Sequence, residues 1–243
     1  RGLRLHRLPL IGDTLRTVTE VVGLKSNAVK PGRAATGLAA LRMHTVDHHG
    51  RTVLDFYRCA MLPMNPRIDP GTAARTDDIS TIGPRDTPSW AVPEGLDLAA
   101  YRRLVPGRHF DSVAARAVFH SSGDVVTGAP ELARLTLNIA ATHHDERVGS
   151  AGRLVYGGHT IGIALAQASR ALPDLVTVLG WHSCDHTGPV HEGDTLTSTL
   201  EVVSAAPLPD GGGTYELRSC VFAHRAGTEP NQVLDWRFTA LLA

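Results

Sequence analysis

Lysine is almost absent from this chain: Lys25 and Lys30 are the only two, so 22 of the 24 basic residues are arginine. An excess of charge of one sign is absent as well, since 24 basic and 24 acidic residues give a formal net charge of +0 at pH 7. Nucleic-acid and membrane-surface binding usually depend on a basic patch. Neither a nucleic acid nor a membrane is therefore expected as a partner.

Cysteine is scarce, with only Cys59, Cys184 and Cys220, and no two of them form a CxxC pair. An odd number of unpaired cysteines argues against a disulfide framework and indicates a reducing, cytoplasmic environment. No apolar run approaches the roughly 18–20 residues of a membrane-spanning helix. With 243 residues, 42% of them hydrophobic and 20% charged, the chain can bury the core of one or two globular domains.

An internal repeat organises the chain. The word Gly-Asp-Thr-Leu occurs at 12–15 and again at 193–196, and Glu-Val-Val occurs at 20–22 and again at 201–203, with the same offset. Val-Leu-Asp at 53–55 recurs at 233–235, one position out of that register. Three words held in nearly one register indicate two copies of the same structural unit.

Each copy is predicted to form three antiparallel strands, because β-branched residues alternate between turn signals rich in glycine. The expected strands are Thr14–Leu24, Leu38–Val46 and Val53–Met61 in the first copy, and Thr195–Ser204, Thr214–His224 and Val233–Leu242 in the second.

More sequence precedes the strands of the second copy. Gly157–Leu172 has the strongest helical pattern in the chain, with one apolar face and Pro173 after its end. A shorter amphipathic helix is predicted over Glu131–Ala141, and a strand over Leu175–Asp185. Region 65–105 is rich in proline and has no sustained periodicity, which predicts a linker.

The predicted fold class is α+β, with a long helix wrapped by an antiparallel sheet. Residues 1–64 are expected to supply the C-terminal strands of a first unit, and residues 106–243 a complete second unit. The offset between the copies places the expected start of the first unit about 75 residues before Arg1. The first unit is therefore expected to be incomplete at its N-terminus, or its beginning to lie outside the sequence.

Two further words carry a resemblance to a known family. Residues 152–161 read Gly-Arg-Leu-Val-Tyr-Gly-Gly-His-Thr-Ile, and Asn138 and His143 precede them in an N-x-x-x-x-H spacing. With the repeated Gly-Asp-Thr-Leu, they resemble the MaoC-like double hot-dog dehydratases, closest to the mesaconyl-CoA hydratase (β-methylmalyl-CoA dehydratase) type. The resemblance covers most of residues 5–62 and 106–243, and it implies a tandem hot-dog fold.

The same resemblance implies an enzyme that adds water across C2–C3 of an enoyl thioester, or removes it, as in fatty acid metabolism. The thioester is expected on CoA or acyl carrier protein, with a short or branched acyl group. Related single-unit hydratases carry Asp five residues before the catalytic His, whereas this chain has Asn138 there. No cofactor is expected, and the two units are expected to pair through their sheets as a pseudo-dimer or homodimer.

His143 is the expected general base, since an imidazole takes a proton near neutral pH. Asn138 can hold the water but cannot accept its proton. Acid and base work therefore falls to His143 alone or to its neighbour Asp145, which is also a candidate for binding substrate. The alternative for His143 is a surface histidine in a turn.

Gly158 is the expected oxyanion donor, because it begins the strongest helix, where N–H groups and the helix dipole favour negative charge. Gly157 is expected to let the substrate approach closely, and Tyr156 and His159 to line the pocket. The alternatives are a turn that needs positive φ for the glycines, and core packing for Tyr156 and His159.

Two other functions remain open from the residues. With Asn138 in place of the acid, the chain could bind acyl thioesters without catalysis; with Asp145 or Asp124 aimed at the thioester carbon, it could be a thioesterase. His182, Cys184 and His186 alternate along a predicted strand and could in principle hold Zn²⁺, but no CxxC or HExxH spacing supports a metal. No metal site is therefore predicted.

Overall fold

A computed structural model describes residues 2–32, 34–71, 74–83, 90, 92–112, 115–148, 152–209 and 211–243. The chain forms two compact units. Unit 1 contains Arg1–Glu94 with Leu179–His182, and unit 2 contains Gly95–Val178 with Ser183–Ala243. Among the described residues, no helix is both long enough and apolar enough to cross a membrane.

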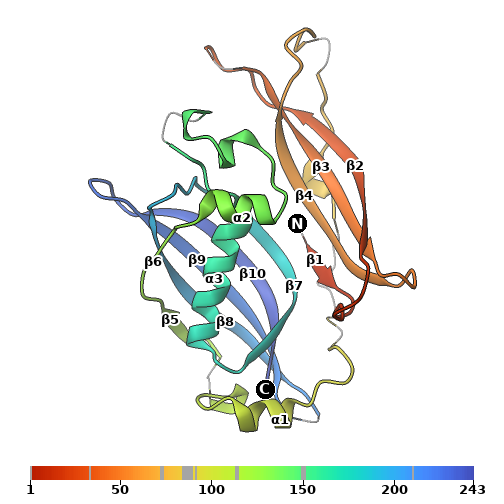
Figure 1. Ribbon diagram of the computed structural model, residues 1–243, viewed down its shortest axis with the longest axis vertical. Coiled ribbons are helices and arrows are strands. Elements are labelled where there is room, and N and C mark those ends of the chain that lie inside the picture. Colours follow the sequence, from red (N-terminus) through yellow and green to blue (C-terminus); the bar gives the residue numbers. More distant parts are fainter. Residues whose placement is uncertain are drawn as a thin grey trace. The chain divides into compact units, whose positions relative to one another are not determined.

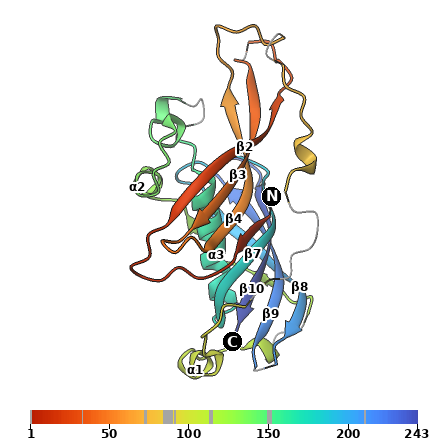
Figure 2. The same cartoon turned by 90° about the vertical axis from the view of Figure 1, so that its right-hand side faces the viewer.

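Unit 1 is built on an antiparallel sheet with the strand order β2-β3-β4-β1. Figure 2 shows the long strands β2, β3 and β4 side by side. Two residues of strand β7, Gly180 and Trp181, pair with β1. The elements are β1 (Leu3–Leu5), β2 (Arg16–Ser26), β3 (Thr36–Val46), β4 (Thr52–Pro63) and the 3₁₀ turn η1 (Ile79–Thr81).

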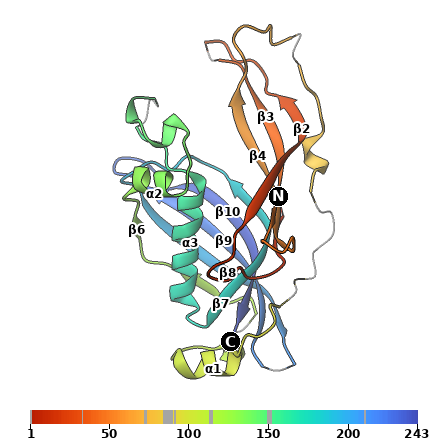
Figure 3. The ribbon, with the colours of Figure 1, turned by 45° about the vertical axis from the view of Figure 1, so that its right-hand side comes forward.

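In unit 2 one long helix, α3, lies against a face of an antiparallel sheet (Figures 1 and 3). The strand order is β7-β10-β9-β8-β5, and β6 also pairs with β8. The helices are α1 (Leu98–Leu104), α2 (Ala129–Leu135) and α3 (Gly157–Ala171), with 3₁₀ turns η2 (Phe110–Ser112), η3 (Ala141–His143) and η4 (Glu146–Val148). The strands are β5 (Val118–His120), β6 (Asp124–Val125), β7 (Leu175–His186), β8 (Thr195–Pro207), β9 (Gly213–His224) and β10 (Asn231–Leu242).

The core of unit 2 comes from the period-two pattern of its strands. In β9 almost every second residue is buried, so one face of the strand is covered. On β10 the rings of Trp236 and Phe238 stack with centroids 3.9 Å apart and are almost fully buried. Helix α3 buries Thr160, Ala164, Gln167 and Ala168, whose spacing of three and four residues defines its sheet-facing stripe.

The repeat read from the sequence is confirmed in the strands, because both copies form three antiparallel strands in the same order. A β-bulge also occurs at equivalent positions of the two copies. The register shifts between Val21 and Gly23 in β2 and between Val202 and Ser204 in β8, in each case over the last valine of the Glu-Val-Val word. A bulge at equivalent positions indicates that the two copies share backbone geometry as well as sequence words.

The helix expected over Glu131–Ala141 is shorter than predicted, since α2 ends at Leu135. The hydroxyl of Thr136 donates to the Leu132 carbonyl, and Leu137 takes a left-handed φ of 55°, which stops the helix. The sequence pattern also missed β1, which has only three residues.

The boundaries 1–64, 65–105 and 106–243 remain a prediction. The region predicted to be a linker contains η1 and α1, and its residues 72–73, 84–89 and 91 lie outside the described residues. Asp97 caps the N-terminus of helix α1, since its carboxylate accepts from the Ala100 amide.

Candidate functional site

The first turn of α3 is enclosed by two aromatic side chains. A Cβ added to Gly157 would lie 2.5 Å from Nε2 of His186, and one added to Gly158 would overlap the ring of Tyr156. Neither glycine has positive φ, so the alternative of a left-handed turn is wrong. These positions are glycine because two rings pack directly on the helix backbone.

The same turn can bind a negatively charged oxygen. Helix α3 begins without a side-chain cap from Tyr156, and the first amides of any α-helix have no acceptor within the helix. The amides of Gly157 and Gly158 therefore concentrate partial positive charge beside Tyr156 and His186.

His143 lies at the end of η3, and its ring is oriented by a backbone group. Its Nδ1 is 2.8 Å from the Leu154 carbonyl, which can only accept, so Nδ1 carries the proton and Nε2 is the basic nitrogen of the neutral ring. The ring meets that of Tyr156 edge-on, with centroids 6.2 Å apart. The structure thus brings His143, Tyr156 and the start of α3 together.

The segment that carries His143 is tied to the segment before α3. The Leu154 amide donates to the Thr142 carbonyl at 3.1 Å, and Nε of Arg153 donates to the His144 carbonyl at 3.1 Å. Arg153 also forms an ion pair with Glu192. These bonds hold the η3 turn in register with the strand-like residues leading into the helix.

Asn138 is held at the end of α2, but through its main chain. Its amide donates to the Ala133 carbonyl at 2.9 Å, and its carbonyl accepts from Nε2 of His144 at 2.7 Å. Its side-chain oxygen lies 3.5 Å from the Ala140 amide. Among the described hydrogen bonds none joins Asn138 to His143, so the link between the two runs through neighbouring residues.

Asp145 is engaged by a neighbouring cation. Both carboxylate oxygens bind Arg147, at 2.9 Å to Nε and 2.7 Å to Nη2, and this pairing lowers the pKa of Asp145. A carboxylate held in this way is a poor base near neutral pH. Asp124, the other carboxylate considered for a thioesterase, binds Gln167 and Arg170.

Two histidines near α3 are kept neutral. Desolvation lowers the pKa of half-buried His159 and that of the more exposed His186, since loss of water around the ring disfavours the charged imidazolium. Nδ1 of His159 is buried with no hydrogen-bond partner in the part of the chain that the structure describes. His186 therefore offers a neutral imidazole directly over Gly157, a placement that the sequence reasoning missed.

Strand alternation is the only sequence signal for His186, and it groups this residue with His182 and Cys184 as a weak metal motif. Burial raises the pKa of the Cys184 thiol to about 12, so that side chain is an uncharged thiol. The described residues contain no group of three or more His, Cys, Asp or Glu side chains arranged to hold a metal ion.

A comparison with solved structures identifies the fold of this chain. A conserved hypothetical protein from Mycobacterium tuberculosis, essential for bacterial survival during infection and with a double hot-dog fold, is 61% identical over 100% of this chain and 74% of its own, with a TM-score of 0.88. This chain is a double hot-dog protein. The tandem hot-dog fold implied by the resemblance is thereby confirmed. No protein-family model matches the chain.

Two curated relatives confirm the resemblance of this double hot-dog protein to the mesaconyl type. It is 29% identical to a mesaconyl-CoA hydratase from Cereibacter sphaeroides over 90% of its length, but spans only 64% of that enzyme. It is 27% identical to a β-methylmalyl-CoA dehydratase from Chloroflexus aurantiacus, over 99% of this chain and 73% of the relative. A MaoC domain protein from Chloroflexus aurantiacus shares the fold, at 24% identity over 99% of this chain and 74% of that one, with a TM-score of 0.76.

The packing of rings on α3 predicts unequal effects of alanine along one helix. Gly157→Ala should lower the free energy of unfolding by about 1–3 kcal/mol, because the new methyl group collides with His186. Gly162→Ala is the matched control, since nothing lies within 4 Å of its added Cβ, and it should raise stability by up to about 1 kcal/mol. Urea denaturation measures both, and equal effects of the two changes would contradict the described packing.

Half-buried His159 predicts a loss of stability in acid. The pKa of His159 is lowered below 6.5 in the folded state, so the unfolded chain takes up its proton first as the pH falls. The contribution is complete above pH 6.5 and is lost below it. Urea denaturation at about pH 7.5 and about pH 5.5 should show a smaller pH effect in His159→Gln than in the unchanged protein. Identical pH effects in the two proteins would show that His159 titrates normally.

Proposed function

We propose that this double hot-dog protein is a hydratase or dehydratase that acts at C2–C3 of an enoyl thioester. The observation that carries the proposal is the ring of His143, oriented by the Leu154 carbonyl so that basic Nε2 is available beside Tyr156 and the first turn of α3. The names of the two curated relatives support the same reaction class. The substrate is an acyl thioester of CoA or acyl carrier protein, with a short or branched acyl group.

In the hydration direction, Nε2 of His143 takes a proton from water while the water oxygen bonds to C3. The C2–C3 double bond shifts electron density to the thioester oxygen, which the Gly158 amide stabilises at the positive end of α3. The proton on His143 is then delivered to C2 as the carbonyl re-forms, so the addition is balanced. Asn138 orients the water, and Tyr156, Gly157, His159 and Asp145 shape the substrate pocket.

The polar partners of Asp145 and Asp124 favour hydration of the double bond over hydrolysis of the thioester. A thioesterase of this chain would need Asp145 or Asp124 as base or nucleophile, yet Arg147 binds the first, and Gln167 and Arg170 bind the second. His143, in contrast, has a tautomer defined by the Leu154 carbonyl, which leaves Nε2 as the nitrogen with a lone pair. Two carboxylates with polar partners and one oriented imidazole together support proton transfer by the imidazole of His143.

The assembly and the cellular location of the protein are part of the same proposal. Double hot-dog units work as pairs, so the protein is proposed to act as a pseudo-dimer within one chain or as a homodimer. The three cysteines without a CxxC pair support a cytoplasmic location.

Incubation with crotonyl-CoA and mesaconyl-CoA tests the function, and His143→Ala tests the base. We expect loss of the enoyl absorbance without release of CoA thiol, and a rate about 10²–10⁴ lower in His143→Ala, because one general base is removed. His120→Ala is the matched control, since His120 is exposed on the short strand β5. Thiol release would indicate a thioesterase, and binding without turnover would indicate a scaffold protein.

Asn138→Asp separates orientation of the water from acid–base work. The aspartate restores the acid–histidine spacing of the simpler hydratases and should retain or raise the hydration rate. Asn138→Ala should lower it less than His143→Ala does, because it removes an orienting hydrogen bond worth about 1 kcal/mol. Progress curves with crotonyl-CoA measure all three variants, and a loss in Asn138→Ala as large as that in His143→Ala would assign Asn138 a direct part in the chemistry.

A further inference from the structure

The ring of His186 packs on the start of α3, yet the proposed reaction gives it no role. A Cβ added to Gly157 would lie 2.5 Å from Nε2 of His186 and 2.7 Å from Cε1, so this edge of the ring faces the helix. Nε2 is therefore the ring nitrogen that lies closest to the first turn of α3.

The ring lies on the side of the turn toward which the free amides point. In an α-helix each Cα–Cβ bond tilts toward the N-terminus, and the first amide N–H groups point the same way. The place that a Cβ of Gly157 would take is occupied by His186, and that of Gly158 by Tyr156. Both rings therefore border the space in front of the amides, where the proposed reaction puts the thioester oxygen.

Hydrogen bonds of the backbone hold His186 at this place. His186 is the last residue of β7. The amide of the next residue, Thr187, donates to the Val233 carbonyl at 3.0 Å. The Thr187 hydroxyl donates to the Gln232 carbonyl at 2.8 Å. These bonds fix the end of β7 against β10.

The segment that enters α3 is tied in turn to the segment that follows β7. The Val155 amide donates to the Val190 carbonyl at 2.8 Å, and Leu154 forms an isolated β-bridge with His191. The approach of the imidazole ring to the helix therefore has hydrogen-bonded backbone on both sides.

The His186 ring is accessible and has the chemistry of a hydrogen-bond donor. The residue is exposed, and the part of the chain that the structure describes offers no hydrogen-bond partner to its two nitrogens. Desolvation lowers the pKa of His186, so the ring is neutral near neutral pH and carries one N–H donor. A negatively charged oxygen in front of the turn favours the tautomer with the proton on Nε2.

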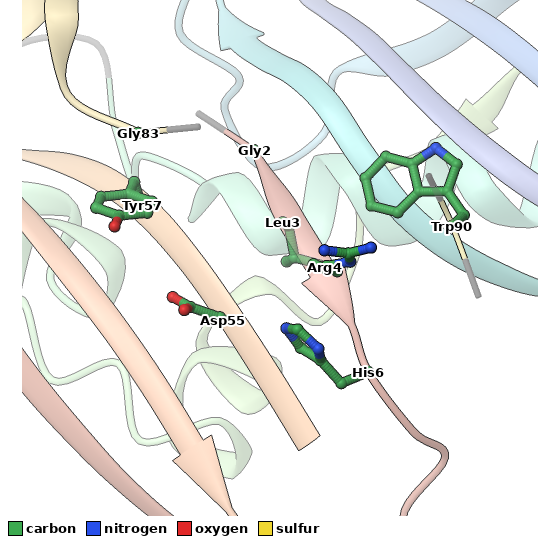
Figure 4. Close-up of a pocket in the computed structure, with 8 residues that line it drawn as sticks. All are labelled: Gly2, Leu3, Arg4, His6, Asp55, Tyr57, Gly83 and Trp90. Atoms are coloured by element: carbon green, nitrogen blue, oxygen red, sulfur yellow. The ribbon is translucent and has the colours of Figure 1, made fainter. Parts of the chain in front are cut away.

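The repeat shows that the strand itself does not require a histidine at this position. His186 ends β7 and Leu5 ends β1, at the same distance before the repeated Gly-Asp-Thr-Leu word. The histidine of unit 1, His6, comes one position later and lines a pocket of that unit with Arg4 and Asp55 (Figure 4). A histidine at the strand end is thus a feature of unit 2, which carries the proposed reaction.

We propose that His186 is a catalytic residue that donates a hydrogen bond from Nε2 to the thioester oxygen, beside the Gly158 amide. This inference rests on the proposed function, since it assigns a second donor to the oxygen that becomes negative as water adds. Such a donor acts most strongly on the transition state, so its loss lowers kcat more than it raises KM. His143 keeps its part as the base.

Two substitutions of matched shape separate a donor from a packing role. His186→Gln keeps an N–H donor, whereas His186→Met has nearly the same length and no donor. We expect kcat with crotonyl-CoA to fall about 10²-fold in His186→Met and less than about tenfold in His186→Gln, with KM nearly unchanged in both. His120→Met is the matched control, since His120 is exposed on β5, and it should leave kcat unchanged.

Equal losses of kcat in His186→Gln and His186→Met would overturn the proposal, because a packing role loses the ring in both. Full activity of His186→Met would overturn it as well. Urea denaturation checks that the two variants are folded. If either unfolds, His186→Asn and His186→Leu form a second pair of matched shape, read in the same way.

Acetoacetyl-CoA gives a second readout that needs no turnover. Its enolate carries a negative oxygen at the thioester and absorbs in the ultraviolet, so donors at that oxygen raise the absorbance of the bound ligand. His186→Met should lose this signal and His186→Gln should keep it. If the unchanged protein converts no enoyl thioester and gives no enolate signal, the proposed function itself fails. If the unchanged protein is active but the two variants behave alike, the inference on His186 fails alone.

Discussion

The packing of α3 on the sheet of unit 2 is the constraint on which the candidate site depends. The helix buries a stripe that includes Gln167, whose side-chain amide donates to the Leu196 carbonyl at 2.9 Å and to Asp124 at 2.7 Å. A buried amide needs such partners. These bonds therefore fix the rotation of α3 about its own axis and its position along the sheet. The position of its first turn, and with it of Gly157 and Gly158, follows from that choice.

Equivalent positions of the two units show what the helix contributes. Val202 on β8 is 0% exposed, whereas Val21, its counterpart on β2, is 58% exposed. The opposite face of each sheet carries the same Glu–Arg–Asp row, which is Glu20–Arg42–Asp55 in unit 1 and Glu201–Arg218–Asp235 in unit 2, so the repeat preserves that face in both units. The two copies therefore share strands, bulge and salt bridge, and they differ in the face that α3 covers.

Histidines, rather than carboxylates, are the available acid–base groups at the candidate site. Arg147 holds Asp145 as a low-pKa carboxylate, while His143 keeps a basic Nε2 through its bond to Leu154. The lowered pKa of His186 keeps it neutral over Gly157, where an imidazolium would be repelled by the positive end of the helix. A site of this type can transfer a proton near neutral pH without a paired carboxylate.

Sequence by itself determined the strands of both copies and the long helix, because alternation and helical spacing are local in the chain. The tandem hot-dog fold came from the resemblance of the sequence words to the MaoC-like family. The same resemblance selected His143 as a candidate, and the helical pattern selected the Gly157–Gly158 pair at the start of the long helix. Only the tertiary structure decided that His186 lies over Gly157, that the Leu154 carbonyl sets the tautomer of His143, and that Arg147 occupies Asp145. Such contacts depend on where a side chain lies after the strands and the helix have packed, and no periodicity in a single sequence encodes that position.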